Sequence, residues 1–271
     1  MRFSDSKYQL PQIEALRANR VMSSGTTLPM SLEGVDRDTG IRDQFVVKFV
    51  KSPRMSPASS AKELIAAWVG MELDLPVVEP VIIHISQPFV ESMRGYDGFI
   101  HASQSLGENF GSRYKAGFEE LLVGQKFSGK MESDALRIYG FDLFITNSDR
   151  GHQKNNVNTN GEEFLIFDHE LSFSHVTILP FLRTKTPWVV SDHEKTLFQK
   201  HVFYPYLKDK KQDFTTFASD LRRINDSFWE KVDTLLPMAW NTSEVGEIRD
   251  YLTQIVEHRD EFADQLTQSL L

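Results

Sequence analysis

The chain has 271 residues, of which 40% are hydrophobic and 25% are charged. This composition is typical of a soluble globular protein with a large buried core. Its 38 acidic and 30 basic residues give a formal net charge of -8, and the lack of a long basic run argues against direct binding of nucleic acid. Cysteine is absent, which excludes disulfides and thiolate metal sites and agrees with a reducing cytoplasm.

We do not expect the N-terminal residues to act as a signal peptide, because Asp5, Lys7 and Glu14 fall where an apolar core would be needed. No stretch reaches the roughly 18 uninterrupted apolar residues of a membrane-spanning helix. We therefore expect a cytoplasmic protein without a membrane partner. One small basic cluster is interpreted as an ordinary solvated surface; it comprises Lys208, Lys210, Lys211, Arg222 and Arg223.

The first part of the chain has the pattern of β structure. Residues 20–50 contain three apolar runs separated by turn-rich segments, which predicts a glycine-containing hairpin followed by a third strand. Apolar residues at helical spacing then predict an amphipathic helix over residues 60–73, which Pro76 ends. A strand over residues 77–85 follows.

From about residue 113 onward the pattern is mainly helical. The apolar spacing predicts helices over residues 117–123, 133–145, 192–202, 213–235 and 243–266. A polar loop over residues 146–160 and a short strand over 164–167, which ends at Asp168, interrupt these helices. The fold class is thus predicted to be α+β. We expect two lobes, residues 1–98 and residues 99–271, with a hinge near residues 99–105.

The densest chemical signal lies in the polar loop and just after the strand that follows it. Phosphoryl transfer needs one carboxylate near the attacking hydroxyl, and it needs hard oxygen ligands that hold Mg²⁺ against the nucleotide phosphates. Asp149, Asn155 and Asp168 supply these residue types. Either segment alone is also typical of turns and helix caps, but their order along the chain favours catalysis.

The first half of the chain offers candidates for nucleotide binding. Lys48 lies in the middle of an apolar strand, where an ammonium is costly to bury without an anionic partner. Nucleotide phosphates and the carboxylate of Glu63, on the next predicted helix, could each be this anionic partner. A loop with small polar residues precedes this strand and could approach phosphates through backbone N–H groups; its candidates are Ser24, Gly25, Thr26 and Thr27.

Two segments resemble the HipA-like kinase family, and more distantly the phosphatidylinositol kinases. Residues 141–150 read FDLFITNSDR, similar to the family's catalytic segment, and residues 165–171 read LIFDHEL, similar to its metal-binding segment. With weaker upstream matches, the resemblance spans about residues 20 to 176. It implies a kinase-like fold with ATP between the lobes, Mg²⁺, and Asp149 as catalytic base. It also implies a protein serine or threonine hydroxyl as acceptor and an antitoxin-like partner.

The match departs from the family at one position. The family's metal-binding Asn follows the catalytic Asp by five residues, a place that Lys154 holds here. A one-residue insertion would restore the register, so Asn155 is the expected ligand beside Asp168, with Asn156 as its substitute.

Two other functions remain open at this point. The chain could be a catalytically inert nucleotide-binding module that acts through a protein partner, since the Asn is displaced. It could also be a metal-dependent phosphohydrolase, since histidines flank both acidic segments; these are His152, His169 and His175.

Overall fold

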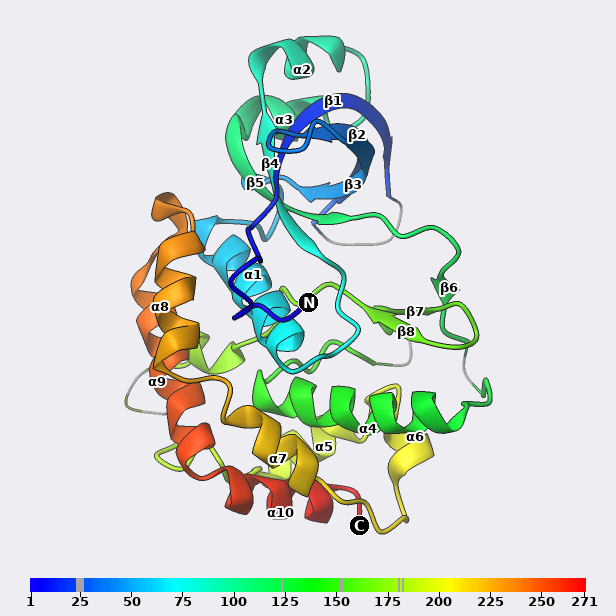
Figure 1. Ribbon diagram of the computed structural model, residues 1–271, viewed down its shortest axis with the longest axis vertical. Helices are drawn as coiled ribbons and strands as arrows, with labels where there is room; N and C mark the ends of the chain where they lie inside the picture. The colour runs from blue at the N-terminus through cyan, green and yellow to red at the C-terminus, as the bar shows by residue number, and fades with distance from the viewer. Residues whose placement is uncertain (23–26, 123, 152–153, 180, 182) are drawn as a thin grey trace.

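The computed structural model describes residues 1–271 apart from residues 23–26, 123, 152–153, 180 and 182. Five strands close into a barrel at one end of the molecule, the top of Figure 1. Its order is β1-β2-β3-β5-β4, with bounds β1 Gln12–Val21, β2 Met30–Asp36, β3 Arg42–Lys48, β4 Pro80–Ile85 and β5 Gly107–Arg113. Neighbouring strands are antiparallel, except that β1 and β4 run parallel and complete the ring.

Alternate apolar side chains fill the barrel. Along β2, buried positions alternate with half-buried ones. The barrel core includes Ile13, Leu32, Phe45 and Ile83. Gly111 allows β5 to lie close against β4, because a Cβ at this position would collide with the Ile83 side chain. The barrel therefore has its own apolar core.

The remaining elements are helices and one small sheet, with β6, β7 and β8 in that order. The small sheet contains β6 Glu119–Glu120, β7 Val157–Thr159 and β8 Phe164–Ile166. The helices are α1 Pro57–Glu72, α2 Gln87–Ser92, α3 Phe99–Gln104, α4 Gly129–Phe144, η1 Ser174–Thr177, α5 Asp192–Phe198, α6 Tyr204–Leu207, α7 Thr215–Leu221, α8 Asp226–Leu235, η3 Met238–Trp240, α9 Ser243–Glu257 and α10 Arg259–Ser269.

Helix α1 lies between the barrel and the other long helices (Figure 1). The hydroxyl of Ser56 caps it by accepting the N–H of Ser59 at 3.1 Å. It contacts β4 and β5 on one side and α9 and η3 on the other. It is therefore buried on nearly all sides, including the polar residue Glu63. The helix predicted over residues 60–73 is confirmed, but it is buried around nearly its whole circumference and is not amphipathic.

The α+β class is confirmed, whereas several element boundaries differ from the prediction. The barrel contains β5, which lies beyond residue 98, and β1 begins well before residue 20. The outward-facing polar residues of β1, such as Arg17 and Arg20, weaken the apolar pattern that reveals a strand.

Three helix predictions need correction. The described residues of 117–123 are a turn and strand β6, whose residues pair with Asn158 and Thr159. The predicted helix 213–235 is two helices, because the side chain of Asn225 accepts the N–H of Phe228 at 3.2 Å and starts α8 anew. The predicted helix 243–266 likewise divides into α9 and α10 at His258, whose backbone is not helical.

A second, larger core joins α1 to the helical part of the molecule. It includes Leu64 and Trp68 of α1, Phe141 of α4 and Leu252 of α9. Shared packing of this kind fixes α1 against α4, and so fixes the segments that follow α4. Within the described ranges, no helix is both long and apolar enough to cross a membrane.

Candidate active site

The candidate site forms where the end of β3, helix α1 and the segment after β8 meet. Lys48, the last residue of β3, is 7% exposed. Its ammonium bonds to the carboxylate of Glu63 and to Oδ1 of Asp168 at 2.7 Å. Glu63 also accepts the backbone N–H of His169 at 2.8 Å. The structure thus joins three elements that are far apart in the sequence through one buried ammonium.

A second ammonium lies on the other side of Asp168. Lys154 Nζ is 3.0 Å from Asp168 Oδ2 and 4.0 Å from Asp149 Oδ2. Burial alone would raise the pKa of Asp168, but the ammoniums of Lys48 and Lys154 lower it well below its usual range. Asp168 is therefore ionised, and one flexible lysine connects it to Asp149.

The charges around Lys48 and Asp149 shift their pKa values too. Burial alone would lower the pKa of Lys48, yet the carboxylates of Glu63 and Asp168 overcome this and raise it. For Asp149, burial raises the pKa; Lys154 opposes this effect and the charge of Asp168 adds to it. A half-buried carboxylate with a raised pKa is a suitable proton acceptor.

The two asparagines of the polar loop have different surroundings. The side chain of Asn155 donates to the backbone oxygen of Leu121 at 2.8 Å and accepts the N–H of Val157 at 2.9 Å. The side chain of Asn156 instead donates to Asp149 Oδ2 at 3.4 Å. Only Asn156 therefore lies beside the catalytic candidate, while Asn155 holds the loop against Leu121, the residue just after β6.

The backbone at two of these positions is unusual. Asn156 has a φ of 50° and Asp168 a φ of 59°, in the left-handed region that few residues other than glycine adopt. Asn and Asp tolerate this region best, and such conformations concentrate at functional sites. Both side chains take their directions from these local backbone conformations.

A buried polar network supports the loop that carries Asp149. Arg150 and Asp142 are both 0% exposed, and Arg150 Nε lies 2.6 Å from Asp142 Oδ2. The same carboxylate bonds to Asn147 Nδ2 at 3.0 Å and to His201 Nε2 at 2.9 Å. Burial alone would raise the pKa of Asp142, but Arg150 and then His201 lower it to about 2. Arg150 Nη1 also donates to the backbone oxygen of Asn156 at 2.7 Å, so this network positions the candidate ligand.

The family of the chain follows from a comparison with known families. The model of the HipA-like kinases matches residues 42–266, a range that includes Lys48, Asp149 and Asp168. The chain belongs to the HipA-like kinase family. The resemblance expected from the two motifs is thereby confirmed, and the protein is a kinase by family.

Other comparisons add little to this assignment. The crystal structure of a Helicobacter pylori proinflammatory kinase, CtkA, is similar over 96% of this chain and 98% of that chain, with 13% sequence identity. Its TM-score of 0.49 is too low to carry an argument about the site. No curated protein matches this HipA-like kinase.

Glu170 is a member of the site that the sequence pattern did not assign. One oxygen each of Glu63, Asp168 and Glu170 lie within 4.8 Å of one another. Glu170 is also 3.8 Å from Lys48 Nζ and 3.8 Å from a guanidinium nitrogen of Arg54. Its position two residues after Asp168 is the only local signal for it. Most glutamates lie on the surface, so this spacing does not reveal that the side chain is buried in the site.

Asp142 and its partner His201 were also missed as positioning residues of the HipA-like kinase. The available signal was a lone carboxylate in the apolar run that ends α4, because a buried charge needs a partner. The partner, His201, could not be found in this way, because it lies 59 positions away in sequence.

Some predicted site residues take no part in the described geometry. Ser24, Gly25 and Thr26 lie outside the described residues, while Thr27 is 1% exposed. His152 also lies outside them.

The other two histidines of the hydrolase alternative are described. His169 is buried beside Arg150, with Nδ1 3.5 Å from Nη2. His175 stacks on Tyr251 at 3.6 Å. Among the described residues, the group of candidate metal ligands contains carboxylates and neither of these histidines.

Proposed function

We propose that this HipA-like kinase uses ATP and Mg²⁺ to phosphorylate a serine or threonine hydroxyl of a protein. The observation that carries the proposal is the position of Lys48, whose buried ammonium pairs with both Glu63 and Asp168. Kinases need a lysine held by a helix carboxylate, next to a metal-binding Asp. The nucleotide would then bind between the barrel and the helical part.

The residues present fit a magnesium ion. Asp168 offers an ionised carboxylate and Asn156 an amide oxygen, which are the hard oxygen ligands that Mg²⁺ prefers. The choice of Asn156 over Asn155 is supported by its contact with Asp149, since both polar atoms of Asn155 are engaged elsewhere. A bound magnesium would neutralise the phosphate charge that develops during transfer.

Lys48 would hold the nucleotide phosphates, and Glu63 would keep its ammonium in place. Asp149 would orient the attacking hydroxyl and accept its proton at a carboxylate oxygen. Its raised pKa and its 29% side-chain exposure both suit a base that an incoming hydroxyl must reach.

Lys154 would have a role both in the site without nucleotide and in the site with nucleotide bound. In the structure its ammonium lies between two carboxylates, Asp149 and Asp168. Without nucleotide, the Lys154 ammonium would balance the charge of these two carboxylates in the place that a metal cation could take. Because its side chain is 39% exposed, Lys154 can swing outward and interact with the transferred phosphoryl group when the nucleotide binds.

Transfer from labelled ATP to the protein's own chain and to candidate acceptor proteins tests the proposal. We expect transfer in the presence of Mg²⁺, and a fall in turnover on the order of 10² or more in Asp149→Asn with nucleotide binding retained. Asp264→Asn, a matched change on the exposed face of α10, should leave transfer unchanged.

Nucleotide binding without transfer in the parent protein would instead identify an inert module that acts through a protein partner. The acceptor and an antitoxin-like partner in the cytoplasm can be sought by crosslinking Asp149→Asn in the presence of ATP, because a trapped complex would persist when turnover is slow. The proposal would be wrong if Asp149→Asn transferred phosphate as fast as the parent.

A further inference from the structure

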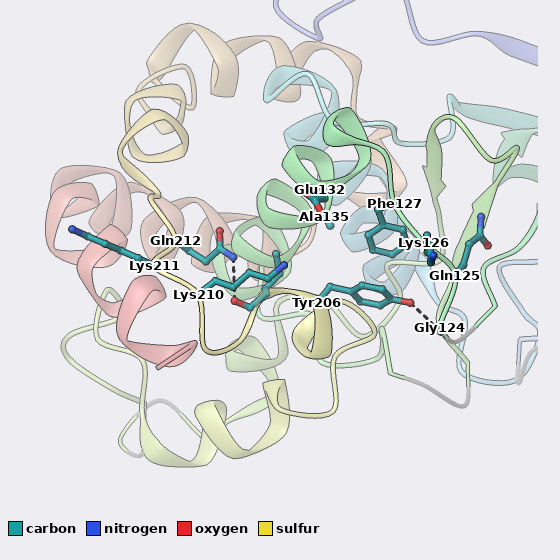
Figure 2. A pocket seen from close by; sticks show the side chains of 11 residues that line it. Gly124, Gln125, Lys126, Phe127, Glu132, Ala135, Tyr206, Lys210, Lys211 and Gln212 are labelled. Atoms are coloured by element: carbon teal, nitrogen blue, oxygen red, sulfur yellow. Dashed lines mark hydrogen bonds between the residues drawn. The ribbon is translucent and has the colours of Figure 1, made fainter.

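A cavity of about 550 Å³ lies away from the residues of the candidate active site. Figure 2 shows that its walls come from two parts of the helical region. One wall contains Gly124–Phe127 and the first turns of α4, and the other contains the end of α6 and residues 210–212. Its volume is within the range of about 300–1,000 Å³ that ligand sites usually have.

A hydrogen bond and ring stacking hold the two walls together. The ring of Tyr206 stacks on Phe127 with centroids 4.1 Å apart. The Tyr206 hydroxyl also joins the walls, because it accepts the backbone N–H of Gly124 at 3.0 Å (Figure 2). Within the second wall, Gln212 donates to the backbone oxygen of Leu207 at 3.1 Å. Since the Tyr206 oxygen acts as an acceptor here, its own hydrogen is available to a ligand.

The cavity is basic in an otherwise acidic protein. Lys126, Lys210 and Lys211 line it, against one carboxylate from Glu132, although the ammonium of Lys211 points away from the other lining side chains (Figure 2). The whole chain, by contrast, has a net charge of -8. Throughout the part of the chain that the structure describes, these three lysines form no ion pair; nearby Lys208 contacts Asp209 at 3.8 Å. Ammoniums without a carboxylate partner leave a positive charge at the cavity that attracts an anion.

The kind of anion follows from the lining. Lysine ammoniums are point charges that bind carboxylates and phosphates alike, so the polar groups beside them must distinguish a peptide from a free anion. The side-chain amides of Gln125 and Gln212 can bond to peptide groups. We propose that this cavity binds an acidic segment of a partner polypeptide, with its carboxylates near Lys126 and Lys210.

Both walls continue into segments that hold the catalytic loop. Leu121, shortly before Gly124, accepts the side-chain N–H of Asn155. His201, shortly before Tyr206, bonds to Asp142 and forms a bridge with Gly151. A partner bound in the cavity would therefore contact elements that also support the loop of Asp149.

Fluorescence anisotropy of a labelled acidic peptide tests this site without nucleotide, so its outcome is independent of phosphoryl transfer. The peptide has about eight residues, half of them glutamate, and a second peptide has glutamine in their place. We expect the acidic peptide to bind more tightly, and its affinity to fall about tenfold or more in Lys126→Glu/Lys210→Glu, because charge reversal turns attraction into repulsion.

Lys208→Glu is the control for each of the two reversals, since it makes one such charge change on a lysine outside the cavity. It should alter the affinity by no more than about twofold. Tyr206→Phe, which removes only the hydroxyl, should weaken binding by a smaller factor than the double reversal. The proposal is overturned if the acidic peptide does not bind, if Lys208→Glu weakens it as much as the double reversal, or if inorganic phosphate displaces it at equal concentration.

Discussion

The buried pair of Arg150 and Asp142 leads to the most informative prediction. Replacing Arg150 with Met keeps an unbranched side chain of similar length but leaves the Asp142 carboxylate without its guanidinium partner. Both residues are 0% exposed, and Asn147 and His201 provide the remaining bonds to Asp142. Breaking a buried ion pair from one side costs about 3–5 kcal/mol, because an uncompensated charge remains in the interior.

This loss is large compared with the total stability of about 5–15 kcal/mol that is typical of folded proteins. With a urea dependence near the upper end of about 1–3 kcal/mol per molar, Arg150→Met should unfold at a urea concentration lower by roughly 1–2 M. Equilibrium unfolding followed by tryptophan fluorescence measures this shift.

A double-mutant cycle separates the ion pair from the rest of the network. Asp142→Leu/Arg150→Met should recover much of the loss seen in either single variant, since removing both charges ends the desolvation penalty. The reasoning would be refuted if Arg150→Met lost less than about 1 kcal/mol, or if the double variant lost the sum of the two single losses.

Three further variants test the site and its surroundings. Asp168→Asn should abolish transfer and the dependence of nucleotide affinity on Mg²⁺, because it removes a charged metal ligand. Isothermal titration with and without metal measures this dependence, and an unchanged dependence would contradict the assignment. Lys154→Met should bind Mn²⁺ about tenfold more tightly without nucleotide, since a competing cation is gone; paramagnetic resonance measures free Mn²⁺, and equal affinities would contradict this role. His175→Phe should keep the stacking on Tyr251 and reduce acid sensitivity. Burial, assisted by the charge of Arg183, lowers the pKa of His175 in the folded protein to about 3. As the pH falls below about 6.5, His175 is therefore protonated in the unfolded chain but not in the folded protein, which favours unfolding. The parent should therefore lose about 2 kcal/mol more than the variant between pH 6.5 and pH 5 in urea unfolding, and parallel curves would contradict the prediction.

Much of the fold and site follows from local sequence properties. Helix α1 was predictable from apolar spacing and from the Pro that follows it. The partners of Lys48 were predictable in kind, since an ammonium in an apolar strand requires an anion. The sequence predicted two kinds of element wrongly. One is an element with a weak local pattern, such as β1, and the other is the long helix, since two predicted helices are interrupted at Asn225 and His258.

The sequence by itself determined which side chains are available for phosphoryl transfer and in which order they occur along the chain. The choice between Asn155 and Asn156 belongs to the tertiary structure, because a left-handed backbone at residue 156 decides which amide faces Asp149. The contact between Lys48 and Asp168 spans 120 positions, and it exists because α1 contacts both the barrel and, through Glu63, the segment after β8. The basic cavity has the same origin: Lys126 and Lys210 reveal nothing together in the sequence, and only packing of Tyr206 on Phe127 makes them line one site. Local propensity acts over a few residues, whereas a site depends on the packing of elements that are distant in the sequence.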